Sequence, residues 1–273
     1  MSAYDPAVAL QFFKAAGKAE KIPAGTTIFE EHEKAKGLLF KSHKMYLLLD
    51  GQVELIAKKK VIGRVAEGQV FGEMASLTDT PRSASAVAKG ACEVIALDDK
   101  QFQAGLKAQP GFALMMMSLM IGRLRETIEK LEGTETLSAA GAVKESVVFD
   151  PKRLAELVAG MTDDPPVYFD RGKVIVREGQ TGMRMYVVIK GTVAVSVTGR
   201  VVERLAPGGV FGELALVEQS PRLASVFAET DCEVLPVNRA GFLQIVKTSP
   251  DFAASLLARL AERLKVLTAK VAR

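Results

Sequence analysis

Val-Phe-Gly-Glu-Met-Ala at residues 70–75 recurs as Val-Phe-Gly-Glu-Leu-Ala at residues 210–215. The chain around these stretches repeats with the same offset of 140 residues, and 13 of the 28 positions between 70–97 and 210–237 are identical. A second shared segment, Pro-Arg-x-Ala-Ser, follows each of them at the same distance. Self-similarity at a fixed period indicates duplicated structural units, so we expect two copies of one fold in this chain.

The limits of the two copies follow from local composition. Each copy opens with an Asp-Pro pair, at Asp5 and at Asp150, which is typical of a helix start with an acidic N-cap and a proline at the first helical position. Glycine, serine and threonine residues between the copies indicate a linker. We therefore predict a first domain over residues 1–132, a linker over residues 133–149 and a second domain over residues 150–273.

The two copies differ in length near their start. Gly25-Thr-Thr-Ile aligns with Gly172-Lys-Val-Ile at an offset of 147 residues, so the first copy carries seven extra residues between Glu31 and Met45. We expect this insertion near the mouth of the first domain, where it would hinder the entry of a ligand.

Composition places the chain among compact folded proteins. Of its 273 residues, 48% are hydrophobic and 25% are charged, which excludes wholesale disorder, collagen and a disulfide scaffold. The 36 Lys and Arg against 32 Asp and Glu give a net charge of +4, which does not by itself indicate nucleic acid. No signal peptide is recognisable, the longest uncharged stretch is short and contains Pro110, and the two cysteines lie far apart. We expect a cytoplasmic protein without a membrane span.

Short runs of β-forming residues alternate with turn residues in each copy. This spacing predicts a β-sandwich or a jelly-roll barrel. In the second copy the runs are Val174–Val176, Tyr186–Ile189, Val193–Val197, Val201–Leu205 and Cys232–Val237. Beyond the last run of each copy, apolar residues step by three and four, as in a long amphipathic helix. The predicted fold class is α+β, mainly β: two tandem jelly-roll β-barrels, each with a short N-terminal helix and a long C-terminal amphipathic helix.

The first long helix carries a narrow apolar stripe, formed by Leu114, Met117, Ile121, Leu124, Ile128 and Leu131. A stripe of this width is typical of a coiled-coil seam, so it predicts a homodimer through the long helices. The alternative is that the stripe packs on its own barrel or on the other copy.

The stretch over residues 71–85 resembles the phosphate-binding cassette of cyclic nucleotide-binding domains, and so does the stretch over residues 211–225. These domains occur in bacterial catabolite activators, in regulatory subunits of cAMP-dependent protein kinase and in cyclic nucleotide-gated channels. The resemblance covers nearly the whole chain outside the linker. It implies that both copies bind a cyclic nucleotide, cAMP or cGMP, as a ligand and that no cofactor is needed.

The chemistry of the cassette agrees with its spacing. Gly72 lets the backbone approach a ligand closely, and the residues after it begin a helical turn whose free N–H groups can hold an anion. The carboxylate of Glu73 only accepts hydrogen bonds, which suits a ribose 2′-hydroxyl. The guanidinium fork of Arg82 suits a cyclic phosphate. In the family these are the ribose-binding glutamate and the phosphate-binding arginine. A Gly-Glu or Pro-Arg pair alone would more often be a structural turn.

The resemblance implies two sets of ligand-binding residues. In the first copy they are Phe71, Gly72, Glu73, Met74, Ala75, Arg82, Ser83 and Thr127, and in the second copy they are Phe211, Gly212, Glu213, Leu214, Ala215, Arg222 and Leu223.

The contacts to the base are expected to differ between the copies. Ser83 occupies a place where a serine occurs in bacterial cAMP receptors, but a hydroxyl there also favours cGMP in some eukaryotic kinases. Thr127 aligns with a threonine of the catabolite activator whose hydroxyl touches the adenine edge. The corresponding residues of the second copy are Leu223 and Leu267. We therefore expect unequal sites and favour cAMP over cGMP in the first.

Other polar clusters have simpler explanations. His32 and His43 lie near Glu30, Glu31 and Glu33, but their spacing matches no tight metal-ligand motif, so we expect a solvated loop and no metal. Lys58-Lys59-Lys60 aligns with Thr198-Gly199-Arg200 and is expected at a hairpin tip. The two cysteines are expected to be buried thiols.

The predicted function is that of a non-enzymatic cyclic nucleotide receptor that signals to an unidentified effector protein through a nucleotide-dependent change in protein contacts. The sequence shows no P-loop and no pairing of nucleophile and base. No helix-turn-helix follows either long helix, so DNA binding is not expected. The alternative is a structural or interaction module whose degenerate cassettes no longer bind nucleotide.

Overall fold

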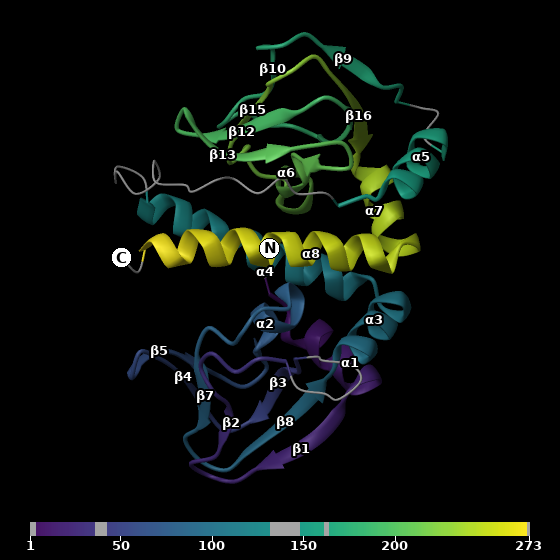
Figure 1. Cartoon of the computed structure of the whole chain (residues 1–273). Helices are drawn as coiled ribbons and strands as arrows, with labels where there is room; N and C mark the ends of the chain where they lie inside the picture. Colours follow the sequence, from purple (N-terminus) through teal and green to yellow (C-terminus); the bar gives the residue numbers. More distant parts are fainter. Residues whose placement is uncertain (1–3, 36–42, 132–147, 161–163, 272–273) are drawn as a thin grey trace. The chain divides into compact units, whose positions relative to one another are not determined.

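The structure is a computed structural model that describes residues 4–35, 43–131, 148–160 and 164–271 (Figure 1). The elements of the first copy are α1 (Pro6–Ala16), β1 (Lys18–Ile22), β2 (Thr27–Phe29), β3 (Met45–Asp50), β4 (Val53–Ala57), β5 (Lys60–Val65), β6 (Val70–Phe71), α2 (Glu73–Thr78), β7 (Ser85–Ala88), β8 (Cys92–Leu97), α3 (Asp99–Ala108) and α4 (Gly111–Leu131). Those of the second are α5 (Pro151–Gly160), β9 (Val167–Phe169), β10 (Val174–Val176), β11 (Arg184–Lys190), β12 (Val193–Val197), β13 (Arg200–Leu205), β14 (Val210–Phe211), α6 (Glu213–Glu218), β15 (Ser225–Ala228), β16 (Cys232–Asn238), α7 (Arg239–Thr248) and α8 (Pro250–Val271).

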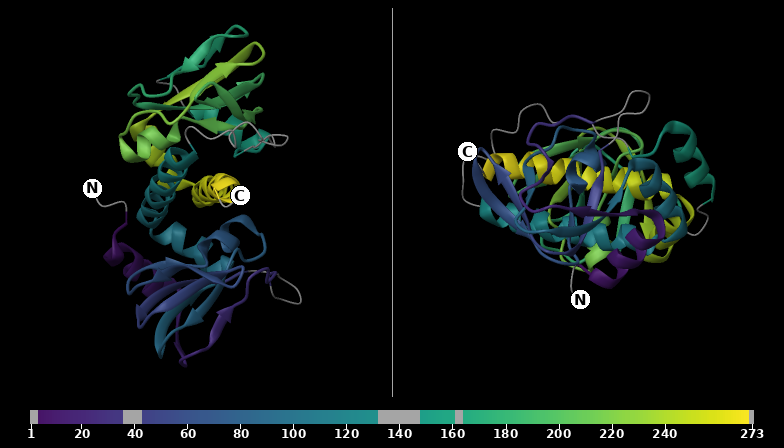
Figure 2. Two further views of the ribbon diagram at one scale, coloured as in Figure 1. Left: turned by 90° about the vertical axis from the view of Figure 1, so that its left-hand side faces the viewer. Right: turned by 90° about the horizontal axis from the view of Figure 1, so that it is seen from below.

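Each copy folds into two antiparallel four-stranded sheets. Their strand orders are β1-β8-β3-β6 and β2-β7-β4-β5 in the first copy, and β9-β16-β11-β14 and β10-β15-β12-β13 in the second. The closed barrel that we predicted is therefore wrong, since hydrogen bonds join strands within each sheet and each copy is a two-sheet sandwich (Figures 1 and 2). Apolar residues from both sheets fill the space between them, as Leu48 and Val53 do in the first copy.

The five strand runs expected in the second copy correspond to β10, β11, β12, β13 and β16. Sequence reasoning missed β9, β14 and β15, which are only two to four residues long. The hairpin tips were placed correctly: Lys58 and Lys59 connect β4 to β5, and Thr198 and Gly199 connect β12 to β13, all with positive φ. Positive φ at both central residues is the geometry of a two-residue type I′ hairpin turn. Both cysteines are buried free thiols.

The chain divides into two compact units that do not coincide with the two sequence copies. The first unit comprises residues 1–116 and 249–265, and the second comprises residues 117–248 and 266–273. Helix α4 thus begins in the first unit and contributes residues 117–131 to the second. Most of the expected linker, residues 132–147, lies outside the described residues, whereas the N–H groups of Val148 and Phe149 both donate to the Gly208 carbonyl.

Four residues of the apolar stripe of α4 are buried within a single chain, and Leu114 is half-buried. Met117 and Ile121 are fully buried, Leu124 is 2% exposed and Ile128 is 9% exposed. The side chain of Leu131 lies outside the description. The homodimer through the long helices stays a prediction.

Helices α1 and α3 of the first unit meet at a cluster of aromatic rings. Phe12 stacks on Phe112 with ring centroids 3.8 Å apart and meets Phe13 and Phe102 edge-on. Gly105 of α3 faces this cluster, where an added Cβ would lie 2.6 Å from the Phe12 ring. The close packing of the two helices therefore depends on a residue without a side chain.

We expect Gly105→Ala to destabilise the protein by about 1 kcal/mol or more, because overpacking outweighs the preference of about 1 kcal/mol for alanine over glycine in a helix. Urea unfolding followed by circular dichroism measures this difference. Gly122→Ala in α4 is the matched control, since a Cβ there meets nothing within 4 Å, and it should be neutral or stabilising. Equal stabilisation by both substitutions would contradict the packing argument.

Candidate functional site

Each cassette begins where a two-residue strand turns into a short helix. Gly72 caps α2 with φ 75° and Gly212 caps α6 with φ 80°, a left-handed conformation that favours glycine. A Cβ at Gly72 would also lie 3.0 Å from Arg82 Nη1. Glu73 and Glu213 are the first residues of these helices and are 5% and 1% exposed. The predicted glutamates therefore lie buried at the helix starts, beside the predicted arginines.

The two arginines are held in the same way by backbone carbonyls. Arg82 donates from Nη1 to the Gly72 carbonyl and from Nη2 to the Lys44 carbonyl, both at 2.7 Å. Arg222 donates from Nη1 to the Gly212 carbonyl at 2.6 Å and from Nη2 to the Arg184 carbonyl at 2.5 Å. These acceptors lie at the ends of paired strands, since Gly72 and Gly212 follow β6 and β14, Lys44 precedes β3 and Arg184 begins β11.

The backbone of each arginine is fixed as well. In the first copy Arg82 exchanges two backbone hydrogen bonds of 2.9 Å with His32 and Glu33. Gly179 and Gln180 make the same pair of bonds, also 2.9 Å long, with Arg222. Positive φ at His32 (65°) and at Gly179 (77°) shows that the turn has the same shape in both copies. Both the main chain and the side chain of each cassette arginine are thus immobilised.

Burial makes these cations unusual. Arg82 and Arg222 are 4% and 8% exposed, and loss of water lowers the pKa of both guanidinium groups. For Arg82, nearby acidic groups including Glu33 and Glu73 oppose the shift. Its Nε is also a buried donor that has no hydrogen-bond partner among the described residues. A buried cation with an unsatisfied N–H fits an anionic ligand, since an unpaired buried donor costs about 1–3 kcal/mol.

Aromatic rings pack against the residues of the first cassette. The Arg82 guanidinium lies over the Phe29 ring, 4.1 Å from its centroid. Phe71 stacks on Tyr46 with ring centroids 5.2 Å apart, and Phe211 stacks on Tyr186 at 5.1 Å in the second copy. The sequence offset places Val176 where the first copy has Phe29. Arg222 thus has no aromatic residue at the matching position.

Two segments of the sequence match the family model of the cyclic nucleotide-binding domain, residues 19–109 and residues 166–249. The chain belongs to this family. Both matched segments contain the complete cassette described above, with its glycine, glutamate and arginine. Each copy is therefore a cyclic nucleotide-binding domain.

Curated relatives are regulatory subunits of cAMP-dependent protein kinase. The one from Eremothecium gossypii is 27% identical over 202 residues, which is 74% of this chain and 39% of the relative. The one from Yarrowia lipolytica is 28% identical over 203 residues, which is 74% of this chain and 48% of the relative. The chain thus spans less than half the length of these relatives. Among solved structures, the catabolite activator protein of Thermus thermophilus is 28% identical and covers 45% of this chain and 59% of its own, with a TM-score of 0.39.

The remaining predicted site residues differ in their placement. Ala75 and Ala215 are buried, whereas Met74, Leu214 and Leu223 are half-buried and Ser83 is exposed. Thr127 belongs to the second compact unit, and its hydroxyl donates to the Arg123 carbonyl within α4 at 2.7 Å. Glu73 and Arg82 belong to the first compact unit, so the expected contact of Thr127 with adenine in the first site stays a prediction. The side chain of Leu267 lies outside the description.

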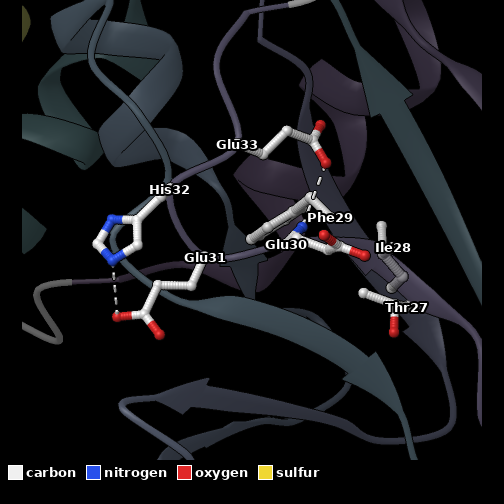
Figure 3. A pocket seen from close by; sticks show the side chains of 7 residues that line it. All are labelled: Thr27, Ile28, Phe29, Glu30, Glu31, His32 and Glu33. Carbon is white, nitrogen blue, oxygen red and sulfur yellow. Dashed lines mark hydrogen bonds and ion pairs between the residues drawn. The ribbon is translucent and has the colours of Figure 1, made fainter.

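Strand β2 and the acidic segment that follows it, together residues 27–33, line a hollow of about 450 Å³ (Figure 3). His32 lies 3.7 Å from the Glu31 carboxylate, and the Glu33 carboxylate accepts a hydrogen bond from the Glu30 N–H. The described residues contain no group of three or more side chains suited to a metal ion. Carboxylates around this hollow would repel a phosphate, so the nucleotide is expected at the arginine.

Among the described helices, none is long and apolar enough to cross a membrane.

His43 lies beside Arg82 and Thr80 of the first cassette, although sequence reasoning placed it in a solvated loop. It is 4% exposed and hydrogen-bonds the Thr80 backbone. Burial, followed by the charge of Arg82, lowers the pKa of its imidazole, while Asp79 and Glu33 act in the opposite direction. The second copy has the exposed Met183 at the equivalent position. In the sequence, this difference between the copies was the only signal that could have pointed to His43 as a residue near the site.

We expect His43 to make folding stability fall as the solution becomes acidic. Its folded-state pKa is lowered, so the unfolded chain takes up a proton first, below about pH 6.5, and stability decreases until the folded His43 is protonated as well. His43→Met should reduce the loss of melting temperature between pH 7.5 and pH 5.5. The control is His32→Asn, which removes the only other histidine, whose side chain is 84% exposed. A wild-type pH dependence that persists in His43→Met would refute this assignment.

Proposed function

We propose that this protein is a non-enzymatic, cytoplasmic receptor for cyclic nucleotides that binds one nucleotide in each of its two cassettes. Arg82 and Arg222 would pair with the cyclic phosphate, and Glu73 and Glu213 would accept a hydrogen bond from the ribose 2′-hydroxyl. The observation that carries the proposal is the buried Arg82 guanidinium, whose Nε lacks a partner among the described residues. A phosphate oxygen supplies the missing acceptor and the missing negative charge.

We favour cAMP over cGMP as the ligand, because the curated relatives are regulatory subunits of cAMP-dependent protein kinase. The two sites are expected to differ in affinity. Arg82 rests on an aromatic ring and lies near the buried His43, whereas Val176 and Met183 occupy the matching positions in the second copy. Ser83 adds an exposed hydroxyl where the second copy has Leu223.

The receptor would signal by a nucleotide-dependent change in its contacts with an effector protein. Nucleotide binding can bias only an element that interacts differently with the free and bound forms. The long helices α4 and α8, which follow α3 and α7 at the end of each copy, are the elements we expect to respond. The alternative is an interaction module whose cassettes are degenerate, and direct measurement of nucleotide binding distinguishes the two.

Removal of both cassette arginines is expected to abolish nucleotide binding. Loss of one partner of a buried charge pair costs about 2–5 kcal/mol, which corresponds to roughly 30-fold to several thousand-fold in affinity. Calorimetry with cAMP and with cGMP should therefore detect binding to the wild type and none to the protein that carries Arg82→Ala and Arg222→Ala. Unchanged affinity in the folded double variant would overturn the site assignment, and absence of binding to the wild type would favour the alternative.

Two further double variants serve as the control and as the fallback for this test. Arg64 and Arg204 occupy equivalent positions on β5 and β13 and bond to Glu54 and Glu229, so Arg64→Ala with Arg204→Ala is the matched control and should bind normally. If the cassette double variant does not fold, Arg82→Lys with Arg222→Lys keeps the charges but removes the forked donors. It should still weaken binding, because a lysine cannot make the paired hydrogen bonds of a guanidinium.

A further inference from the structure

One hydrogen bond links the long helix of the first copy to the cassette of the second. Arg125 on α4 donates from Nη2 to the Ser220 hydroxyl at 2.6 Å, across 95 residues of sequence. Both residues belong to the second compact unit. The bond is short and the donor is charged, which places it among the stronger hydrogen bonds of proteins.

Ser220 occupies a sensitive position in the cassette. It follows Gln219, which ends α6 in a left-handed conformation with φ 53°, and it precedes Arg222 by two residues. The backbone of Arg222 is bonded on both sides, to Gly179 and Gln180. Arg125 therefore holds the one stretch that connects the helix bearing Glu213 to the arginine expected to bind the phosphate.

The first copy is built differently at the matching place. Thr80 corresponds to Ser220, and its hydroxyl pairs with the Thr78 hydroxyl at 2.7 Å. Lys265 on α8 corresponds to Arg125. The first copy thus stabilises this stretch with its own residues, Thr78 and His43, whereas in the second copy it is bonded to a helix that belongs to the other copy in the sequence.

We infer that Arg125 is a positioning residue of the second nucleotide site, so that this site is assembled from the cassette of one copy and the long helix of the other. The inference rests on the proposed nucleotide binding. Arg125 acts through Ser220 by holding the segment 219–222 in the shape in which Arg222 meets the phosphate. A segment that is ordered before binding loses less conformational freedom on binding, and the affinity is correspondingly higher.

The test measures cAMP affinity at the second site, in a protein whose first site is disabled by Arg82→Ala, or weakened by Arg82→Lys if the alanine variant does not fold. Arg125→Met should weaken binding there by about ten-fold, the lower end expected for loss of a hydrogen bond to a charged group. Arg125→Lys should restore part of the affinity, since it keeps the charge. Lys265→Met, at the equivalent position of α8, is the matched control and should leave the second site unchanged.

A double-mutant cycle distinguishes positioning through Ser220 from a general effect on stability. Ser220→Ala should weaken the second site about as much as Arg125→Met, and the two substitutions together should weaken it no further. In a protein whose second site is disabled by Arg222→Ala, Arg125→Met should leave binding at the first site unchanged. Equal loss at both sites, additive losses in the cycle, or wild-type affinity in Arg125→Met would overturn this inference alone. If the second site of the otherwise unaltered chain binds no cyclic nucleotide, the proposed function of that site fails as well.

Discussion

A guanidinium group buried among backbone carbonyls determines the shape of each cassette. Two N–H donors of Arg82 are satisfied by the carbonyls of Gly72 and Lys44. These neutral acceptors leave the positive charge of the guanidinium uncompensated. Only a glycine fits at position 72, because the backbone must take a positive φ while the arginine lies 3.0 Å from the place of a Cβ. The glycine, the strand pair and the arginine therefore constrain one another, and the proposed anionic ligand would supply the missing negative charge.

Duplication has preserved this constraint while its surroundings have diverged. The helix of the first cassette is bonded to the start of α3 through Ser76 and Asp99, whose side chains lie 2.8 Å apart. In the second copy a leucine replaces the serine, and the side chain of Arg239 donates to the Leu216 carbonyl at 3.3 Å. The cassettes are thus attached to the following helix by different interactions, which gives a physical reason to expect different responses to the same nucleotide.

The compact units of the protein do not follow the order of the sequence. Helix α4 is continuous from Gly111 to Leu131, yet its residues from 117 onward belong with the second copy. The same holds for residues 249–265, which belong with the first. Each long helix is therefore divided between the two units, so the boundary between the units does not coincide with the boundary between the sequence copies.

The sequence alone determined the duplication, the family, the cassette glycines, glutamates and arginines, and the hairpin tips, because each depends on local residue identity at a fixed spacing. Tertiary structure alone decided what those residues contact. The bonds from the arginines to Lys44 and Arg184 span 38 residues, and the bond from Arg125 to Ser220 spans 95. The burial of His43 and the open sandwich in place of a closed barrel likewise arise from long-range pairing. An apolar or polar pattern specifies which face of an element is covered, but the partner that covers it depends on how distant segments pack, and no local spacing encodes that choice.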